Sequence, residues 1–144
     1  MAIVLEYCPD GDLRKLIKET RLSDEEYENI IKKIVEALVY LHDKKIVHRD
    51  IKPENILMMK GVPKITDFGS SKVVMSTGAK TREGTQFYMA PEIFEGLKYD
   101  GRVDIWSLGI LSYELLVGKR IFEVVPGLRP PAERKDFPFE SMFN

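Results

Sequence analysis

One stretch of the chain, residues 23–43, most constrains the fold. Ser23 is followed three residues later by Glu26, the pattern of a helix capping box in which each side chain satisfies a backbone amide of the other residue. Apolar residues then recur at the spacing of one helix face, namely Ile30, Ile31, Ile34, Leu38 and Leu41. We therefore predict a long helix that runs to about Asp43 and packs this stripe into a core. His42, near its end, is interpreted as a cap favoured by the helix dipole rather than as a catalytic group.

The composition fits a single globular domain and excludes several functions. A chain of 144 residues with 44% hydrophobic residues has enough apolar side chains for a core. The net charge of −1 and the absence of a basic stripe argue against a nucleic-acid partner. No run of about 18 apolar residues is present, so we expect no membrane span. The single cysteine, Cys8, excludes an intramolecular disulfide and has no metal-ligand spacing with the two histidines, which favours a reducing, cytoplasmic or nuclear location.

The remaining elements are predicted from shorter patterns. Residues 2–7 are apolar and rich in branched side chains, and a Pro-Asp-Gly turn follows, so we predict a strand there. Asp12 is placed to cap a short helix over residues 13–19. Two apolar runs, residues 56–59 and 63–66, bracket a Lys-Gly-Val turn and predict a small β-hairpin.

A second long helix is predicted over residues 102–116. It is apolar almost all round, which indicates a buried helix, and Gly118 is placed to stop it. Asp104 is the anomaly on this helix, because burying a carboxylate is costly unless hydrogen bonds satisfy it. A simple helix-start acid is the alternative interpretation of Asp104.

Residues 48–55, His-Arg-Asp-Ile-Lys-Pro-Glu-Asn, concentrate groups suited to phosphate chemistry. Pro53 fixes its own φ and keeps the preceding residue out of the helical region, so Asp50, Lys52 and Asn55 are expected on an extended loop where they can converge. Phosphoryl transfer depends mainly on positioning and charge cancellation, which a carboxylate, a cation and a carboxamide supply.

This octapeptide resembles the catalytic loop of eukaryotic protein kinases, in the form typical of the serine/threonine branch. The resemblance implies that Asp50 accepts the proton of the substrate hydroxyl and that Asn55 holds a magnesium ion. Lys52 would neutralise charge on the transferred phosphoryl group. Glu54 would lean the preference toward basic substrates, as in some kinases. His48 is expected to be structural.

Asp67-Phe68-Gly69 follows Asn55 by twelve residues and matches the magnesium-chelating motif of the same family. The resemblance makes Asp67 a second magnesium ligand and Phe68 structural. It also places the adenine of ATP against the backbone of residues 6–8 and above Leu57.

The nucleotide-binding residues that the resemblance implies are therefore Glu6, Cys8, Asp12, Leu57 and Asp67, with Leu5 as gatekeeper and with ATP and Mg²⁺ as cofactors. For Asp12, a place near the ribose and the capping role are both kept open.

Residues 70–83 are rich in serine and threonine and look like an activation segment, which an Ala-Pro-Glu triplet ending at Glu92 closes. Thr85 matches the threonine that contacts the catalytic aspartate and lysine. We hypothesise that Thr81, once phosphorylated, pairs with Arg49, with Ser76 and Thr77 as competing sites and an unmodified threonine as the alternative.

In the family, the residue matching Asp104 binds the backbone of the His-Arg-Asp turn and so fixes Asp50. Glu92 would lack the arginine that usually pairs with it in kinases.

The fold class that we predict is mainly α (α+β), an incomplete kinase-like large lobe with a small hairpin at the active site. Residues 1–122 would form this partial domain and residues 123–144 an irregular, proline-containing tail. The resemblance implies a protein serine/threonine kinase with a protein substrate, weak or inactive in isolation because the glycine-rich loop and its lysine are missing. Alternatives are a non-catalytic module that docks onto a kinase or scaffold protein, and a gene-model fragment.

Overall fold

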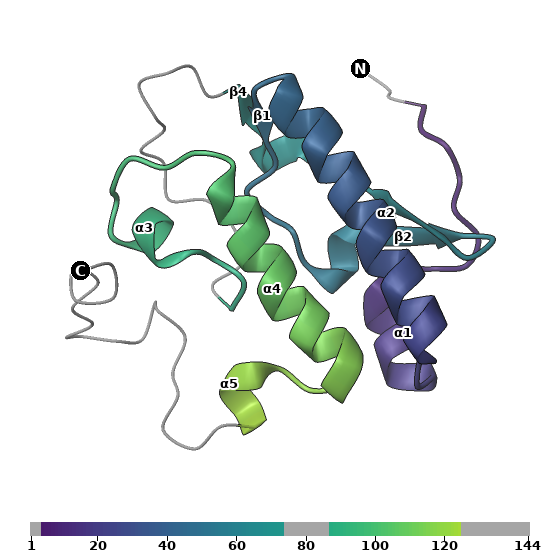
Figure 1. Cartoon of the computed structure of the whole chain (residues 1–144). Helices are drawn as coiled ribbons and strands as arrows, with labels where there is room; N and C mark the ends of the chain where they lie inside the picture. Colours follow the sequence, from purple (N-terminus) through teal and green to yellow (C-terminus); the bar gives the residue numbers. More distant parts are fainter. Residues whose placement is uncertain (1–3, 74–86, 125–144) are drawn as a thin grey trace.

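The computed structural model describes residues 4–73 and 87–124. The helices are α1 (Leu13–Glu19), α2 (Asp24–Asp43), α3 (Pro91–Phe94), α4 (Arg102–Val117) and α5 (Ile121–Val124), and 3₁₀ turns cover Pro53–Asn55 and Phe68–Ser70. The strands are β1 (Ile46–Val47), β2 (Ile56–Met59), β3 (Val62–Ile65) and β4 (Lys72–Val73). The predicted mainly helical architecture with a small hairpin is confirmed (Figure 1).

Helix α2 begins and ends where the sequence predicts. The Ser23 hydroxyl accepts from the Glu26 amide at 3.3 Å, and the Glu26 carboxylate accepts from the Ser23 amide at 2.8 Å, so both halves of the capping box are present. Ile30, Ile34 and Leu38 are buried, as expected for the inward stripe of an amphipathic helix.

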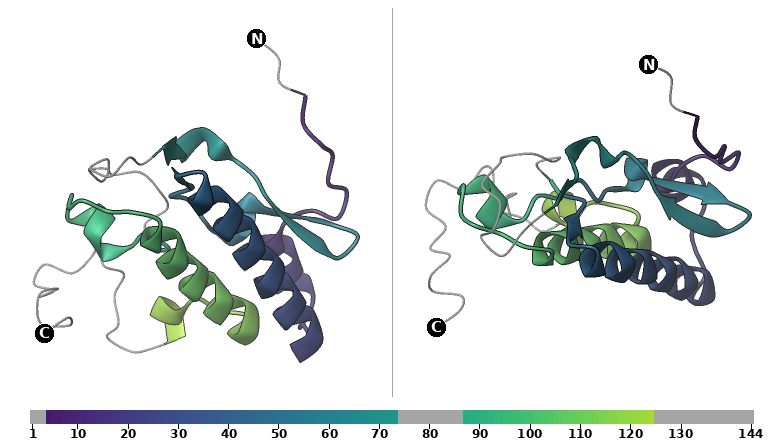
Figure 2. Two further views of the ribbon diagram at one scale, coloured as in Figure 1. Left: turned by 45° about the horizontal axis from the view of Figure 1, so that its top comes forward. Right: turned by 90° about the horizontal axis from the view of Figure 1, so that it is seen from above.

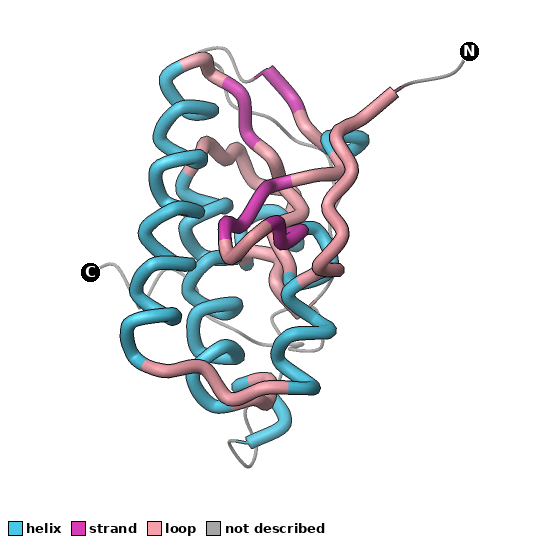
Figure 3. Tube along the Cα trace, turned by 90° about the vertical axis from the view of Figure 1, so that its right-hand side faces the viewer, coloured by secondary structure: helices cyan, strands magenta, loops and turns pink. Residues whose placement is uncertain are grey.

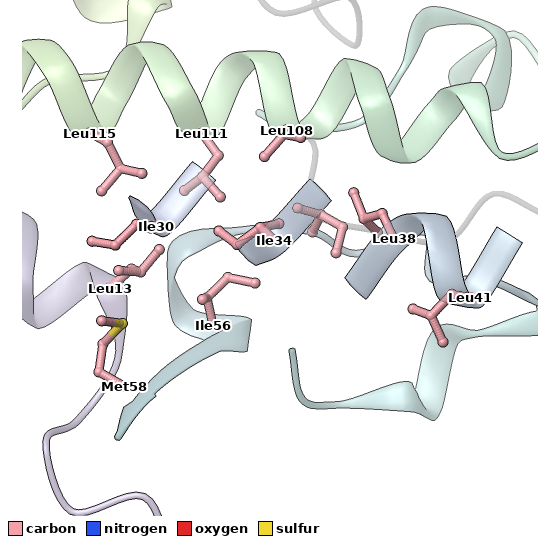
Figure 4. Close-up of a cluster of buried hydrophobic side chains, with 11 residues drawn as sticks. Leu13, Ile30, Ile34, Leu38, Leu41, Ile56, Met58, Leu108, Leu111 and Leu115 are labelled. Carbon is pink, nitrogen blue, oxygen red and sulfur yellow. The ribbon is translucent and has the colours of Figure 1, made fainter. Parts of the chain in front are cut away.

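The core lies between α2 and α4, which run alongside each other in Figures 1 and 2. Figure 4 shows Leu108, Leu111 and Leu115 of α4 facing the apolar stripe of α2, with the hairpin and α1 closing the far side. Leu111 has no exposed surface. Burial of such side chains contributes about 1.5–3 kcal/mol each, so this cluster is a large source of the stability of the fold.

Helix α4 ends as predicted but is buried less completely than its composition suggests. Gly118 caps it in the left-handed region at φ 76°, a conformation that costs glycine little. One face carries the buried residues, whereas Ile105, Trp106, Leu116 and Val117 are exposed among the described residues. The prediction of an all-round buried helix is therefore wrong, because the neighbouring described elements cover only one side of it.

Residues 4–8 form no strand, which contradicts the strand predicted for residues 2–7. This segment runs as irregular chain past the hairpin, with Val4, Leu5 and Tyr7 exposed. Branched residues favour a strand only where a partner strand supplies the hydrogen bonds, and no described strand pairs with this segment.

The hairpin and the loops lie together on one side of the two long helices (Figure 3). Strands β2 and β3 pair antiparallel, with Ile56 opposite Ile65, and the second strand begins at Val62, one residue earlier than predicted. Strands β1 and β4 form a second antiparallel pair, which brings the chain after the Asp-Phe-Gly motif back beside the start of the octapeptide. None of the described helices has both the length and the apolar character needed to cross a membrane.

Candidate active site

The octapeptide makes a tight turn around one buried carboxylate. Asp104 of α4 is fully buried and accepts from the backbone amides of His48 at 2.9 Å and Arg49 at 2.8 Å. Arg49 has a φ of 70°, a left-handed conformation that costs a non-glycine residue about 1–2 kcal/mol. The carboxylate offsets this strain because both amides point at it. The backbone contact that the resemblance implies for Asp104 is thus present.

A third donor reaches the same carboxylate from α2. The Nε2 atom of His42 lies 2.8 Å from Oδ2 of Asp104. This contact was not predicted from the sequence, where His42 is interpreted only as a cap favoured by the helix dipole. The available signal was position, because His42 lies in the last turn of α2, six residues before the octapeptide begins.

Asp50 is held from two sides by residues of its own loop. Nζ of Lys52 lies 2.8 Å from Oδ2 of Asp50, and the Asn55 amide nitrogen donates to the same oxygen at 3.0 Å and to the Asp50 carbonyl at 2.8 Å. Lys52 is extended as predicted, but Pro53 starts a 3₁₀ turn that includes Asn55. The predicted convergence of the three side chains therefore occurs, through a turn and not a fully extended loop.

The ring of His48 joins the octapeptide to the Asp-Phe-Gly motif. Its Nδ1 accepts from the Asp50 amide at 3.3 Å, which leaves Nε2 to donate to the Thr66 carbonyl at 2.9 Å. The Phe68 ring meets it edge-on, with ring centroids 5.1 Å apart. Because His48 is fully buried, these contacts fix the motif residues relative to one another.

Asp67 lies at the end of β3, next to the octapeptide. The Thr66 amide donates to the Asn55 carbonyl at 2.9 Å, so the backbone brings the residue before Asp67 against Asn55. Asp67 is exposed, has a left-handed φ of 59°, and accepts from the Gly69 amide at 3.3 Å.

A cavity of about 770 Å³ lies beside Asp67, within the usual range for small-molecule sites. Four of the predicted nucleotide-binding residues line it together, namely Glu6, Cys8, Leu57 and Asp67, as does the predicted gatekeeper Leu5. Ile65 and Phe68 extend its apolar wall, and Lys64, paired with Glu6 at 2.7 Å, lies at the same cavity. Asp50 and Asn55 do not line it. They adjoin it through the Asn55–Thr66 backbone bond.

The donor groups fit a magnesium ion. Mg²⁺ prefers oxygen ligands and takes one or two protein groups together with phosphate oxygens and water. Asn55 directs its amide nitrogen at Asp50, which leaves its amide oxygen as the ligand, and Asp67 supplies a carboxylate. Among the described residues no group of three or more His, Cys, Asp or Glu is placed to hold a metal by itself, so the phosphates of a nucleotide would complete the coordination.

Asp12 does not line the cavity. Its carboxylate accepts from the Lys15 amide at 2.8 Å, which is the predicted capping role, and its backbone bridges to Leu57. The place near a ribose stays a prediction.

Arg49 donates from Nη1 to the Tyr99 hydroxyl at 3.0 Å and from Nε to the Ser70 carbonyl. Glu92 lies partly buried in the first turn of α3. Thr81 and Thr85 lie outside the described residues. The hypothesis that phosphorylated Thr81 pairs with Arg49 therefore stays a prediction. The tail predicted for residues 123–144 lies outside them from residue 125 onward.

Comparison with known proteins agrees with this geometry. The model of the protein kinase domain family matches residues 1–130. Aurora kinase A-B of Xenopus laevis is 50% identical over 123 residues, which cover 84% of this chain and 30% of that protein. Aurora kinase C of Mus musculus is 46% identical over 84% of this chain and 45% of its own length. An Aurora kinase of Yarrowia lipolytica is 44% identical over 134 residues, which cover 92% of this chain and 36% of that protein.

This chain thus spans less than half the length of each of these relatives. The resemblance inferred from the motifs, including its serine/threonine character, is confirmed, as is the partial kinase-like lobe. On its motifs, its fold and these matches, the chain belongs to the protein kinase family.

Proposed function

We propose that this chain forms part of a protein serine/threonine kinase that transfers the γ-phosphate of ATP to hydroxyl groups of proteins. The observation that carries the proposal is the bracing of Asp50 by Lys52 and Asn55 beside the cavity of Asp67. A structural turn does not require three charged or amide side chains to converge next to an open pocket, whereas phosphoryl transfer does.

The reaction follows from these positions. A substrate serine or threonine oxygen forms a bond to the γ-phosphorus as the bond to the β–γ bridging oxygen breaks, and ADP leaves with that electron pair. Asp50 accepts the hydroxyl proton, while Lys52 orients its carboxylate and offsets charge on the transferred group. Asn55 and Asp67 would hold magnesium, which supplies charge neutralisation at the phosphates when bound.

The cavity walls would bind the base of ATP. Leu5, Leu57 and Ile65 present apolar surface suited to an aromatic ring, and Glu6 and Cys8 line the same cavity, where their backbone would bind the edge of the base. We further propose a cytoplasmic or nuclear location, protein substrates, and contacts to a regulatory or scaffold protein, with neither nucleic acid nor membrane as a partner. Fluorescence microscopy of the tagged chain tests the location, and signal confined to a membrane or an organelle lumen would contradict it.

A chimaera tests the catalytic proposal. The chain replaces the matching 123 residues of Xenopus laevis Aurora kinase A-B, which supplies the rest of a kinase. Transfer of radiolabelled γ-phosphate to serine and threonine peptides is measured for the chimaera, for its Asp50→Ala variant, and for an Asp43→Asn variant as the matched surface control.

We expect the chimaera and the Asp43→Asn variant to transfer phosphate and the Asp50→Ala variant to lose at least about 100-fold, the scale of a positioned proton acceptor. Equal transfer with and without Asp50 would refute the assignment. The chain alone is expected to transfer weakly or not at all. A Mg-ATP titration of the chain alone then separates an enzyme from a non-catalytic module, because a ligand of the folded state must raise the thermal midpoint.

A further inference from the structure

Arg14 of α1, a residue that the proposed mechanism does not use, contacts three other parts of the chain. Its Nε donates to Glu54 at 2.8 Å, and its guanidinium bonds both carboxylate oxygens of Glu114 on α4. Its Nη2 also donates to the Tyr88 hydroxyl at 2.6 Å. One side chain thereby links α1, the octapeptide, α4 and the segment that precedes α3.

The charges explain why this network is held firmly. The Glu114 side chain is only 3% exposed, and a buried carboxylate is stable only with a partner. Tyr88 donates to Glu114 at 2.5 Å, and Nε of Arg120 lies 3.8 Å from it. Burial raises the pKa of Tyr88, and the Glu114 contact raises it further, so Tyr88 stays a neutral donor.

Arg14 itself stays charged in this setting. Burial works against its charge, yet its bonds to Glu114 and Glu54 leave its pKa above the ordinary value. For Glu54, burial acts to raise the pKa, but the Arg14 bond, a backbone hydrogen bond and the charges of Arg14 and Lys52 together outweigh it, so the pKa is lowered. Glu54 is therefore held in its ionised form, and one guanidinium contacts the carboxylates of both Glu54 and Glu114.

The network also adjoins the catalytic loop. Glu54 lies between Pro53 and Asn55 in the same 3₁₀ turn, and Asn55 bonds the Asp50 carboxylate at 3.0 Å. The Glu54 side chain is 41% exposed, whereas that of Arg14 is 15% exposed. Glu54 and Glu114 thus form an acidic pair near the proposed proton acceptor Asp50, and Arg14 of the same chain binds both carboxylates.

We propose that Arg14 is a specificity-determining residue, which occupies the acidic position beside the catalytic loop and so removes any preference for substrates with a basic residue near the acceptor hydroxyl. The inference rests on the proposed kinase function. A substrate cation would have to displace an intramolecular guanidinium that loses little freedom on binding, and it would meet that like charge as it approached. The sequence around Glu54 indicates the opposite, a preference for basic substrates. Its partner Arg14 lies 40 residues away, so the pairing is not visible in the local sequence.

The first test asks whether the position accepts an external guanidinium once Arg14 is removed. Thermal midpoints are measured for Arg14→Ala with and without ethylguanidinium, against sodium chloride at equal ionic strength. Arg102→Ala is the matched control, because Arg102 pairs with Asp100 on the surface outside the network. We expect ethylguanidinium to raise the midpoint of Arg14→Ala by several degrees relative to wild type and Arg102→Ala.

The gain should disappear in Arg14→Ala combined with Glu54→Gln and Glu114→Gln. An equal response of wild type and Arg14→Ala would overturn the proposal, as would an undiminished gain without the two carboxylates. Where Arg14→Ala does not fold in plain buffer, the refolding yield replaces the midpoint. Recovery by ethylguanidinium but not by sodium chloride supports the proposal, and failure to recover overturns it.

The second test measures preference in the chimaera described above. Two peptides differ only by arginine or glutamine at positions next to the acceptor serine, and kcat/KM is compared. We expect a ratio near one for the parent and a rise of about tenfold or more in favour of arginine for Arg14→Gln. An unchanged ratio in Arg14→Gln contradicts the proposal. No transfer to any peptide counts instead against the proposed kinase function, and the ethylguanidinium test still decides the role of Arg14.

Discussion

Replacement of Asp104 by alanine should destabilise the fold more than almost any other single change. The carboxylate is fully buried and accepts from the His48 amide, the Arg49 amide and the His42 ring. A buried donor left without an acceptor costs about 1–3 kcal/mol, and two backbone donors are affected. The strained left-handed turn at Arg49 also loses its support. We therefore expect the free energy of unfolding to fall by about 3–5 kcal/mol.

The assay is urea unfolding followed by circular dichroism, with linear extrapolation to water. Asp104→Asn keeps one acceptor oxygen and should lie between alanine and wild type. Asp43→Asn, at the exposed end of α2, is the control and should stay within about 0.5 kcal/mol of wild type. A loss below about 1 kcal/mol for Asp104→Ala would refute the view that this carboxylate holds the turn.

Three further changes test other parts of the structure. Ser23→Ala should lower the unfolding free energy by about 1 kcal/mol in urea. The backbone bond from residue 23, which alanine keeps, and the Ser23 hydroxyl bond, which alanine removes, both lower the pKa of Glu26. The stability difference from wild type that the hydroxyl bond contributes should therefore narrow as pH falls below the unfolded value of about 4.3, and a constant difference at all pH values would contradict this. Leu111→Ala removes a side chain with no exposed surface and should lower the unfolding free energy by about 2–5 kcal/mol. Leu116 is 51% exposed, so Leu116→Ala should change the unfolding free energy little, and similar losses for the two variants would refute the assigned core. Gly101→Ala would place its Cβ 2.9 Å from Nδ1 of His42 and should lower the unfolding free energy by about 1–3 kcal/mol. In a double-mutant cycle, the added change His42→Ala should relieve part of this loss, and strictly additive losses of the two changes would exclude the contact.

Local patterns predicted much of the fold. The capping box and the apolar stripe of α2, the stop at Gly118 and the hairpin depend on residues close in sequence, and each appears where expected. Residues 4–7, the described part of the predicted strand, form no strand because a strand needs a partner, which composition cannot reveal. The exposed face of α4 went unpredicted for a related reason, since an apolar helix composition does not say which neighbours cover it.

The candidate site was predicted through motifs, but several of its supporting contacts were not. The convergence of Asp50, Lys52 and Asn55 follows from a short loop, and the family resemblance supplied Asp104 as its anchor. The His42 contact to Asp104 and the Arg14 network join residues 62 and 100 positions apart, so no local pattern carries them. Such contacts depend on how α1, α2 and α4 pack, which only the assembled fold shows.

The proposed active site is tested most directly by locating the bound metal and nucleotide. NMR spectra of the isotope-labelled chain are recorded with ATP and Mn²⁺ in place of Mg²⁺. Mn²⁺ is used because its unpaired electrons broaden the resonances of nearby residues with a steep distance dependence. We expect selective broadening of the signals of Asp50, Asn55, Leu57 and Asp67, while the signals of Ser23 and Gly118 stay sharp. The broadening should be weaker in the Asp67→Asn variant. Uniform broadening, or loss of signal at residues away from the octapeptide and the Asp67 cavity, would contradict the proposed active site.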